Sequence, residues 1–302
     1  MPEFKSWIKA ARPRTLPLSI SGILVGTALA GYYGSVDYIV FCLALLTTIG
    51  FQITSNFAND YGDGVKGTDN DKRIGPKRVI QSGLITAKEL KRGIIISVVI
   101  CLLLVFSLLF TAFGMHNMLF SLVFLLLGFL SIWAALKYTL GESAYGYHGL
   151  GDLFVFIFFG LVGVIGSMFL YIKEIPPLSL LPAVSMGLLS VGVLNLNNLR
   201  DYESDKDAGK NTIIVKIGFL NGKVYHYFLL IISFICLLFF VIFTYQNWLQ
   251  FSSLLAYIPI FIHLIKIKST NIAKNVDPEL KKLALSTFLM AILFYFSYNI
   301  FL

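Results

Sequence analysis

The sequence predicts an all-α membrane protein with nine transmembrane helices. Hydrophobic residues make up 57% of the 302 residues and charged residues only 13%, too little charge to cover a water-soluble protein of this length. Nine stretches contain the roughly 20 mostly apolar residues that a helix needs to cross a bilayer. The basic residues are also distributed very unequally between the connecting segments. These three observations indicate that the lipid bilayer is the main solvent of this chain.

The first span is expected at residues 16–34, directly after the sequence "RPRTLP" at residues 12–17. Residues 1–30 also have the layout of a signal peptide, with a basic start, an apolar run and Ala28-Leu29-Ala30. The arginine- and proline-rich sequence is typical of a helix start. We therefore interpret this segment as the entry of a retained first helix.

Eight further spans follow without a long interruption, so we expect one transmembrane domain over residues 1–302. They are expected at residues 38–58, 93–114, 117–136, 153–172, 178–199, 224–245, 248–266 and 283–301. An odd number of spans places the two termini on opposite sides of the membrane. With the N-terminus in the cytoplasm, 23 of the 24 Lys and Arg residues lie inside and only Lys173 lies outside, as the positive-inside rule requires. This basic cytoplasmic face explains the net charge of +8 without a nucleic-acid partner.

Two of the cytoplasmic connections are rich in acidic residues. The first acidic cluster contains Asp60, Asp63, Asp69 and Asp71, and the second contains Asp201, Glu203, Asp205 and Asp207. Both clusters share a layout, because Asn56 and Asn197 each stand four positions before an Asp-Tyr pair. This repeated layout suggests a faint internal duplication.

The spacing of the aspartates predicts a metal site. Asp60 and Asp63, like Asp201 and Asp205, are three or four residues apart and are expected to share one face of a helix. Each pair lies at a helix C-terminus, where the helix dipole is already negative, so bound cations would stabilise them. Oxygen ligands without His or Cys favour Mg²⁺, which commonly binds carboxylates together with substrate phosphates. We therefore expect a diphosphate to bridge the clusters. The alternative, solvated loops whose acids pair with nearby lysines, explains the matched layout less well.

Basic and amide side chains near both clusters are candidates for binding the diphosphate. They are Asn59, Lys66, Arg73, Arg78, Asn198, Lys206 and Lys210. Arginine can bind phosphate through two parallel hydrogen bonds, and lysine acts as a point charge. The asparagines can orient ligands or complete a coordination shell. Gly62, Gly64 and Gly67 are expected to let the first connection wrap around a phosphate.

On these motifs the chain resembles the UbiA superfamily of intramembrane prenyltransferases. The first cluster matches the N-D-x-x-D pattern of the family as "NDYGD" at residues 59–63, and the second matches D-x-x-x-D as "DYESD" at residues 201–205. Gly67 stands where the family has a further acid, so Asp69 is a candidate substitute. The stretches "RPRTLPLS", "SNFANDYGDGVKGTDNDKRIGPKR", "AYGYHGLGDLFVFIFFG" and "NNLRDYESDKDAGKNT" are most similar to members that act on 1,4-dihydroxy-2-naphthoate.

The resemblance implies a reaction and a place for it. A polyprenyl diphosphate would lose diphosphate, and its allylic group would alkylate 1,4-dihydroxy-2-naphthoate with loss of CO₂, giving demethylmenaquinol. The helices would surround a central cavity that opens sideways to lipid, in the bacterial cytoplasmic membrane. The site would face the cytoplasm, and Mg²⁺ on Asp60, Asp63, Asp201 and Asp205 would neutralise the departing diphosphate.

The connection between spans 117–136 and 153–172 carries groups that suit an aromatic acceptor. Tyr138, Tyr145, Tyr147, His148 and Asp152 are all placed to orient or deprotonate its phenol. Lys137 is a candidate partner for the acceptor carboxylate or the diphosphate, and we select Lys137 and Tyr147 as catalytic candidates beside the four aspartates. The histidines at positions 116, 226 and 263 stand alone in the sequence and are assigned no role.

Two other functions remain open at this point. Another member of the superfamily, acting on 4-hydroxybenzoate or haem, would carry the same aspartates. A cation-coupled transporter would also use acidic residues, but transporter sites usually lie near the middle of the bilayer, whereas these acids gather at one face. The length of the prenyl chain and the oligomeric state are not determined by these patterns.

Overall fold

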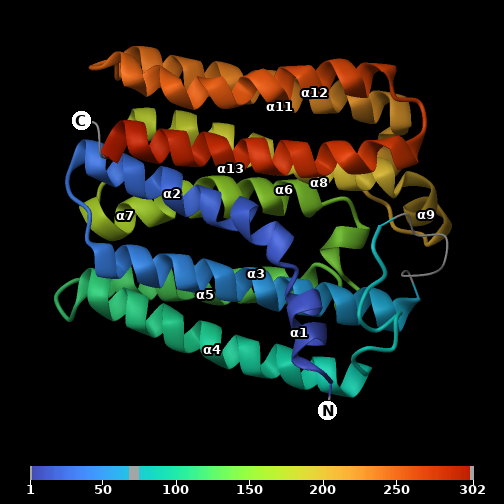
Figure 1. Ribbon diagram of the computed structural model, residues 1–302. Coiled ribbons are helices and arrows are strands. Elements are labelled where there is room, and N and C mark those ends of the chain that lie inside the picture. The colour runs from blue at the N-terminus through green and yellow to red at the C-terminus, as the bar shows by residue number, and fades with distance from the viewer. Residues whose placement is uncertain (1, 68–74, 300–302) are drawn as a thin grey trace.

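The structure is a computed structural model that describes residues 2–67 and 75–299. Over these two ranges the chain is entirely helical, without strands, and nine helical stretches are long and apolar enough to cross a membrane. The long helices run alongside one another in a single bundle (Figure 1). The prediction of an all-α protein with nine spans is therefore confirmed.

The nine stretches follow the expected order, and most begin or end within a few residues of the expected position. They are Phe4–Tyr33 (α1 Phe4–Ala11, η1 Pro13–Thr15, α2 Leu16–Tyr33), α3 Tyr38–Lys66, α4 Ala87–Phe113, α5 Met118–Lys137, Gly151–Ile172 (α6 Gly151–Val155, η3 Phe156–Gly166, α7 Ser167–Ile172), Pro177–Arg200 (η4 Pro177–Ser179, α8 Leu180–Arg200), α11 Phe219–Phe243, Trp248–Ser269 (η5 Trp248–Ala256, α12 Tyr257–Ser269) and Ala273–Asn299 (η6 Ala273–Val276, α13 Asp277–Asn299). Short helices α9 Tyr202–Asp207 and α10 Ile213–Ile217 follow α8, and η2 Tyr145–Tyr147 lies after α5.

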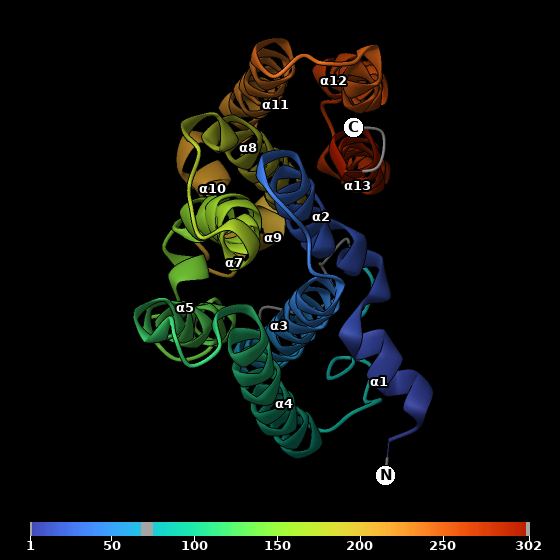
Figure 2. The same cartoon turned by 90° about the vertical axis from the view of Figure 1, so that its left-hand side faces the viewer.

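The first span is bent where the sequence suggested a helix entry. Arg12 separates α1 from η1 and α2 and has a left-handed backbone conformation with φ of 52°. The bend sets α1 at an angle to the bundle (Figure 2). The Trp7 ring of α1 packs edge-on against Phe57 of α3, with ring centroids 5.5 Å apart. The contact ties α1 to the helix that carries the first acidic cluster.

Helix α3 is longer than expected, and it changes the interpretation of the first acidic cluster. The Asp37 side chain accepts hydrogen bonds from the Ile39 and Val40 backbone N–H groups at the start of α3, and the helix continues to Lys66. Gly62 and Gly64 therefore lie inside a helix, so the prediction that they give a loop its flexibility is wrong. A Cβ atom at Gly62 would lie 2.6 Å from the Thr139 hydroxyl oxygen. Glycine is needed there because the loop after α5 lies against α3.

The largest buried core lies between α2, α8 and α13, which pack together near the middle of the bundle (Figure 2). Leu29, Leu196 and Phe294 contribute fully buried side chains from these three helices. At the contact between η3 and α8, a Cβ at Gly160 would come within 2.6 Å of the Gly187 Cα. Small residues allow such close approach of helices in a membrane, where packing drives their association. The core thus fixes α8, which leads into the second acidic cluster.

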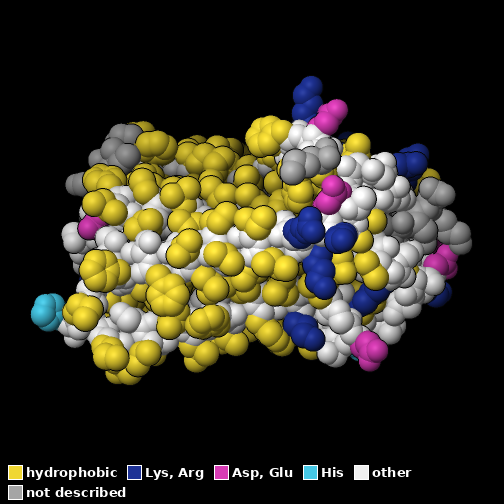
Figure 3. All heavy atoms as spheres, turned by 90° about the horizontal axis from the view of Figure 1, so that it is seen from below, with side chains coloured by type: hydrophobic (Ala, Val, Ile, Leu, Met, Phe, Trp, Pro, Cys, Tyr) yellow, Lys and Arg dark blue, Asp and Glu magenta, His cyan; other side chains and the backbone are white. Residues whose placement is uncertain are grey.

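Between α5 and the η3–α7 stretch lies an apolar cavity of about 520 Å³, lined mainly by Leu, Val, Ile and Phe side chains. The surface of the bundle is also apolar, with hydrophobic side chains spread along its length (Figure 3). In that view, Lys, Arg, Asp and Glu side chains gather toward one end of the molecule. Large side chains such as Phe110, Leu119 and Ile265 are about 70% exposed. The chain is a multi-pass membrane protein whose charged groups concentrate at one end of the bundle.

Candidate active site

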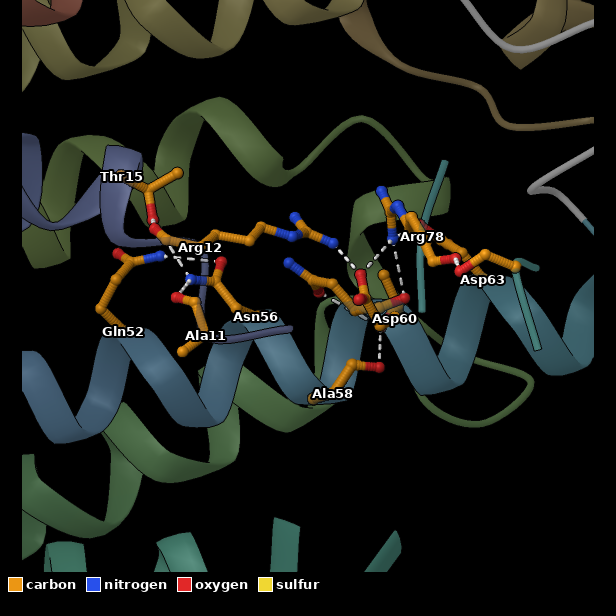
Figure 4. A network of polar contacts seen from close by, with 12 residues as sticks. Ala11, Arg12, Thr15, Gln52, Asn56, Ala58, Asp60, Asp63 and Arg78 are labelled. Carbon is orange, nitrogen blue, oxygen red and sulfur yellow. Dashed lines mark hydrogen bonds and ion pairs between the residues drawn. The ribbon is translucent and has the colours of Figure 1, made fainter. Parts of the chain in front are cut away.

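The last two turns of α3 place Asp60 and Asp63 on one buried face, as their spacing predicted. Both carboxylates face Arg78, whose Nη1 lies 2.8 Å from Asp63 Oδ2 and 3.6 Å from Asp60 Oδ1. Arg12 donates a further hydrogen bond to Asp60 Oδ1 (Figure 4). Burying ionised carboxylates is costly unless they are paired. The two arginines provide that pairing for this cluster.

Asn56 holds the bend at Arg12 against α3. Its side-chain N–H group donates to the Ala11 carbonyl oxygen at 2.8 Å and to the Thr15 hydroxyl at 3.1 Å (Figure 4). These bonds fix the backbone on both sides of Arg12, so that its side chain reaches the first cluster. The sequence pointed to Asn56 because it stands four positions before an Asp-Tyr pair, as Asn197 does. Arg12 was not predicted as a site residue, because the Arg-Pro sequence indicated only a helix start.

The second cluster lies at the junction between α8 and α9. Asp201 occupies the junction, and Arg200 donates two hydrogen bonds to its carboxylate, at 2.8 and 2.7 Å. Arg200 also bonds Asp277 at the start of α13, at 2.8 Å. Asp205 forms an ion pair with Lys210 at 3.5 Å, and its other oxygen, Oδ2, is buried with no hydrogen-bond partner among the described residues. Asp201 is thus neutralised through both oxygens, whereas Asp205 keeps one oxygen available.

The two clusters meet around Lys210, which pairs with Asp205 and lies 5.8 Å from the ring of Tyr147, whose hydroxyl donates to Asp63. Burial raises the pKa of Asp205 to about 6; Lys210 opposes this shift, and both Asp201 and Asp63 add to it. Burial alone would lower the pKa of Lys210, but Asp205 and Asp63 are among the groups that raise it overall. Asp63 of the first cluster therefore acts on Asp205 and Lys210 of the second. The tertiary fold brings together residues that lie about 140 positions apart.

The loop between α5 and α6 covers this meeting point. The Tyr147 hydroxyl donates to Asp63 Oδ1 at 2.8 Å, and its backbone carbonyl accepts from the Asn211 N–H at 3.0 Å. Lys66 Nζ lies 4.1 Å from the centre of the Tyr147 ring, and Lys210 Nζ lies 5.8 Å from it. Tyr147, predicted as a catalytic candidate, thus contacts side chains that flank both clusters.

The donor set fits Mg²⁺ bound together with a substrate. Asp60, Asp63, Asp201 and Asp205 are all buried carboxylates, and no described residue bonds Asp205 Oδ2. Within the described ranges, no three His, Cys, Asp or Glu residues are gathered closely enough to hold a metal ion by themselves. Mg²⁺ typically takes one or two carboxylates and completes its shell with waters and phosphate oxygens. The arrangement is typical of Mg²⁺ bound together with substrate phosphates rather than of a metal ion enclosed by protein ligands alone.

The other predicted site residues occupy varied positions. Arg78 Nη1 donates to the Asn59 carbonyl oxygen at 2.9 Å, and the Thr139 hydroxyl lies 3.2 Å from Asn59 Oδ1. Asn198 Oδ1 is buried with no hydrogen-bond partner in the described part of the chain, and Asn198 lines a gap beside the α5–α6 loop that is too small for a water molecule. Lys137 makes no ion pair with a described residue, and Lys206 is exposed on α9. The remaining candidates, Arg73 and Asp69, lie outside the described residues.

Two histidines that stand alone in the sequence are partners in the structure. His226 of α11 and His263 of α12 have their Nε2 atoms 2.9 Å apart, and His263 Nδ1 lies 2.9 Å from Glu279 of α13. Lys282 donates to the same glutamate at 2.6 Å. The interpretation of these histidines as isolated is wrong. Their spacing of 37 residues carries no signal, because only the packing of three helices brings them together.

Comparisons with known proteins agree with this architecture. The profile of the UbiA prenyltransferase family matches residues 19–277. The chain is 48% identical to the 1,4-dihydroxy-2-naphthoate octaprenyltransferase of Escherichia coli (strain K12), over 80% of this chain and 78% of that protein. It is 43% identical to the protein of the same name from Haemophilus influenzae, over 97% of this chain and 95% of that protein.

Solved structures share the fold. A UbiA homologue from Archaeoglobus fulgidus bound to DMAPP and Mg²⁺ superposes with a TM-score of 0.69 at 17% identity, covering 98% of this chain and 99% of that one. The same homologue bound to GPP and Mg²⁺ gives 0.68 at 16% identity, covering 97% and 99%. Both structural matches cover nearly the whole chain. The sequence relatives add homologues that are 43% and 48% identical. The chain therefore belongs to the UbiA prenyltransferase family.

Proposed function

We propose that this protein transfers a polyprenyl group from polyprenyl diphosphate to 1,4-dihydroxy-2-naphthoate, releasing CO₂ and diphosphate and forming demethylmenaquinol. The observation that carries this proposal is the 43% identity to a 1,4-dihydroxy-2-naphthoate octaprenyltransferase over 97% of the chain. The buried geometry supports it, because two aspartate clusters and an aromatic loop meet at one end of the bundle. This function places the protein in menaquinone biosynthesis.

We assign binding of the polyprenyl diphosphate to the two aspartate clusters. Asp60, Asp63, Asp201 and Asp205 would hold Mg²⁺, which supplies neutralisation of the negative charge that develops on the departing diphosphate. Lys66, Arg78 and Lys210 are suited to bind phosphate oxygens, because they already surround these carboxylates and carry positive charge. Arg12 would keep Asp60 oriented from the bend of the first span.

The allylic group needs an apolar, electron-rich lining while it carries positive charge. The Tyr145 and Phe154 rings are stacked with centroids 4.0 Å apart, and Phe158 follows at 6.2 Å from Phe154. Aromatic faces stabilise a cation by about 0.5–2 kcal/mol each. The Tyr145 ring also packs edge-on against Tyr138, with centroids 5.4 Å apart, so this row of rings begins at the loop that covers the clusters.

Incubation of the purified protein with octaprenyl diphosphate, Mg²⁺ and a panel of acceptors tests the proposal. We expect product with 1,4-dihydroxy-2-naphthoate together with one CO₂ released from a carboxyl-labelled acceptor, and no product with 4-hydroxybenzoate or haem. Labelled CO₂ and the lipid-soluble product are measured in parallel. Prenylation of 4-hydroxybenzoate or haem instead would assign the chain to a different member of the family. Absence of transfer to all three acceptors would contradict an enzymatic role.

We further propose that the protein lies in the bacterial cytoplasmic membrane with its N-terminus and active site facing the cytoplasm. The gathering of charged side chains toward one end of the bundle supports this orientation. Alkaline phosphatase fused after Leu302 should therefore be active, and green fluorescent protein at the same position should stay dark. The same two reporters fused before Met1 provide the matched control and should give the opposite result. Fluorescence at the C-terminal position would contradict the proposed orientation.

A further inference from the structure

Helix α1 lies across the direction of the long helices rather than along it (Figure 1, Figure 2). It is separated from α2 by Arg12, whose backbone is left-handed. Helix α2 alone has 18 residues and is about 27 Å long at 1.5 Å per residue, close to the roughly 30 Å of the hydrocarbon core of a bilayer. The first crossing of the membrane therefore does not require α1, which is left to lie along the membrane surface.

Contacts with α3 and α4 hold α1 at the end of the bundle that carries the acidic clusters. The Trp7 ring packs against Phe57, which stands three positions before Asp60 in α3. A Cβ at Gly93 of α4 would lie 2.5 Å from the same ring. Trp7 thus contacts both helices, and these contacts fix the position of α1 against the bundle.

The side chains of α1 form distinct faces, because residues four apart in a helix lie on the same side. Ser6 and Ala10 are only 7% and 0% exposed and face the bundle. Phe4 and Ile8 are 79% and 44% exposed. One face of α1 therefore packs on the protein, and a second face presents large apolar side chains outward.

The third face of α1 is basic. Lys5 and Lys9 are four residues apart and exposed, and the start of α4 adds exposed Lys88, Lys91 and Arg92. None of these five side chains forms an ion pair with a described residue. In both segments cations outnumber acids, and the acid of the α4 segment is held in the capping box that starts the helix. The α1 surface, formed by α1 and the first turns of α4, thus carries excess positive charge beside an apolar face.

We propose that the α1 surface binds the headgroups of anionic phospholipids while its apolar face inserts among their acyl chains. Helices that lie in a membrane interface combine basic and bulky apolar side chains in this way. The choice of a lipid follows from the two adjacent faces, because a soluble anion would engage only the basic one. Each basic residue near an anionic leaflet strengthens binding by about fivefold.

The α1 surface is connected to the first aspartate cluster through the bend of the first span. Asn56 donates to the carbonyl oxygen of Ala11, the last residue of α1, at 2.8 Å. The next residue, Arg12, donates to Asp60. Anionic lipid bound to α1 therefore holds the arginine against a carboxylate that is assigned to Mg²⁺, and it raises turnover. This link to catalysis rests on the proposed function, whereas binding of the lipid does not.

Fluorescence of Trp7 in the full-length protein tests binding of the lipid. Trp133→Phe and Trp248→Phe remove the other two tryptophans, and the protein is placed in nanodiscs that contain phosphatidylcholine and phosphatidylglycerol, one of them brominated just below the headgroup. At equal mole fraction, brominated phosphatidylglycerol should quench Trp7 more strongly than brominated phosphatidylcholine. High salt should reduce the difference, because it screens exposed charges.

Paired lysine variants separate the α1 surface from the general positive charge of this end of the protein. Lys5→Gln combined with Lys9→Gln should remove most of the difference in quenching, because each lysine contributes about fivefold. Lys274→Gln combined with Lys281→Gln is the matched control. These two lysines are also exposed, lie in η6 and α13, and should leave the difference unchanged.

Prenyl transfer in the same nanodiscs tests the connection to Asp60. Phosphatidylglycerol should raise the turnover of the unaltered protein at least about fivefold over pure phosphatidylcholine, the low end of typical coupling between two sites. The Lys5 and Lys9 double variant should show no such increase. Asn56→Ala should keep the preferential quenching of Trp7 and lose the increase in turnover, because it releases α1 from the bend.

The outcomes are distinguishable. Equal quenching of the unaltered protein by the two brominated lipids would overturn the lipid surface. Preferential quenching without higher turnover would overturn the link to Asp60. A raised KM for polyprenyl diphosphate in the Lys5 and Lys9 double variant in pure phosphatidylcholine would show that these lysines bind substrate instead, and would also overturn the inference. Absence of prenyl transfer in every nanodisc would contradict the proposed function, whereas the quenching decides the lipid surface on its own.

Discussion

Replacement of Asp60 by asparagine is expected to lower prenyl transfer by about 10²–10³-fold or more while the protein remains folded in the membrane. The amide keeps the shape of the side chain but removes a charge that would hold Mg²⁺ at the diphosphate. Removal of a single group that stabilises developing charge typically costs a factor of this size in kcat. Asp205→Asn should act in the same way; it weakens the ion pair with Lys210, whereas Asp205 Oδ2 has no hydrogen-bond partner among the described residues.

The measurement compares octaprenyl transfer by purified variants with their elution on size exclusion and their helical circular dichroism. Glu279→Gln is the matched control, since it also neutralises a buried, ion-paired carboxylate, whose partners are His263 and Lys282 rather than residues of either cluster. Asp60→Asn and Asp201→Asn each break a buried pair with an arginine, which costs about 3–5 kcal/mol, so the folding measurements are essential for both variants. Normal turnover by folded Asp60→Asn and Asp205→Asn would refute the metal role of these carboxylates.

Removal of divalent metal is expected to abolish prenyl transfer, and Mg²⁺ is expected to restore it. The four buried aspartates and the diphosphate carry negative charges that the surrounding lysines and arginines offset only in part. The proposed reaction therefore depends on an added cation to let diphosphate leave. The requirement should also depend on pH. Burial raises the pKa of Asp205 to about 6, and only the deprotonated carboxylate binds metal, so more Mg²⁺ should be needed as the pH falls through 6.

Turnover is measured after treatment with EDTA and then during titration with Mg²⁺. The titration is carried out once at pH 5.5 and once at pH 7.5. Addition of Ca²⁺ to a parallel sample serves as the control for charge alone, since Ca²⁺ prefers longer bonds and a higher coordination number. Asp205→Asn should lose the difference between the two pH values. Undiminished turnover in metal-free buffer would contradict the scheme.

The helical architecture was largely predictable because lipid imposes a simple rule on sequence. A span must satisfy its backbone hydrogen bonds internally and must be apolar for about 20 residues, so composition reveals it directly. The rule predicts where a helix enters lipid but not how far it continues into water. The second span was expected to end at residue 58, yet α3 continues to Lys66 because its last turns pack against the α5–α6 loop at Thr139. The prediction of flexible glycines failed for the same reason.

The aspartates of the candidate site were predictable because their spacing on a helix is a local property. Asp60 and Asp63 share one face, and their shared contact with Arg78 follows from the helical repeat. Arg12 was not recognised as a site residue because its role depends on Asp60, a partner in another helix. The sequence identified Asp152 only as one of several residues that could orient or deprotonate the aromatic acceptor. Its hydrogen bond from Tyr225 of α11 is evident only in the folded structure.

The sequence by itself determined the solvent of this protein, the number of its spans and the acidic motifs at their ends, since each depends on residues close together along the chain. Only the tertiary structure decided which charges neutralise one another, which histidines pair and which loop covers the site. Those features depend on distances between helices, and the packing of side chains across the bundle sets these distances in a way that no local pattern encodes.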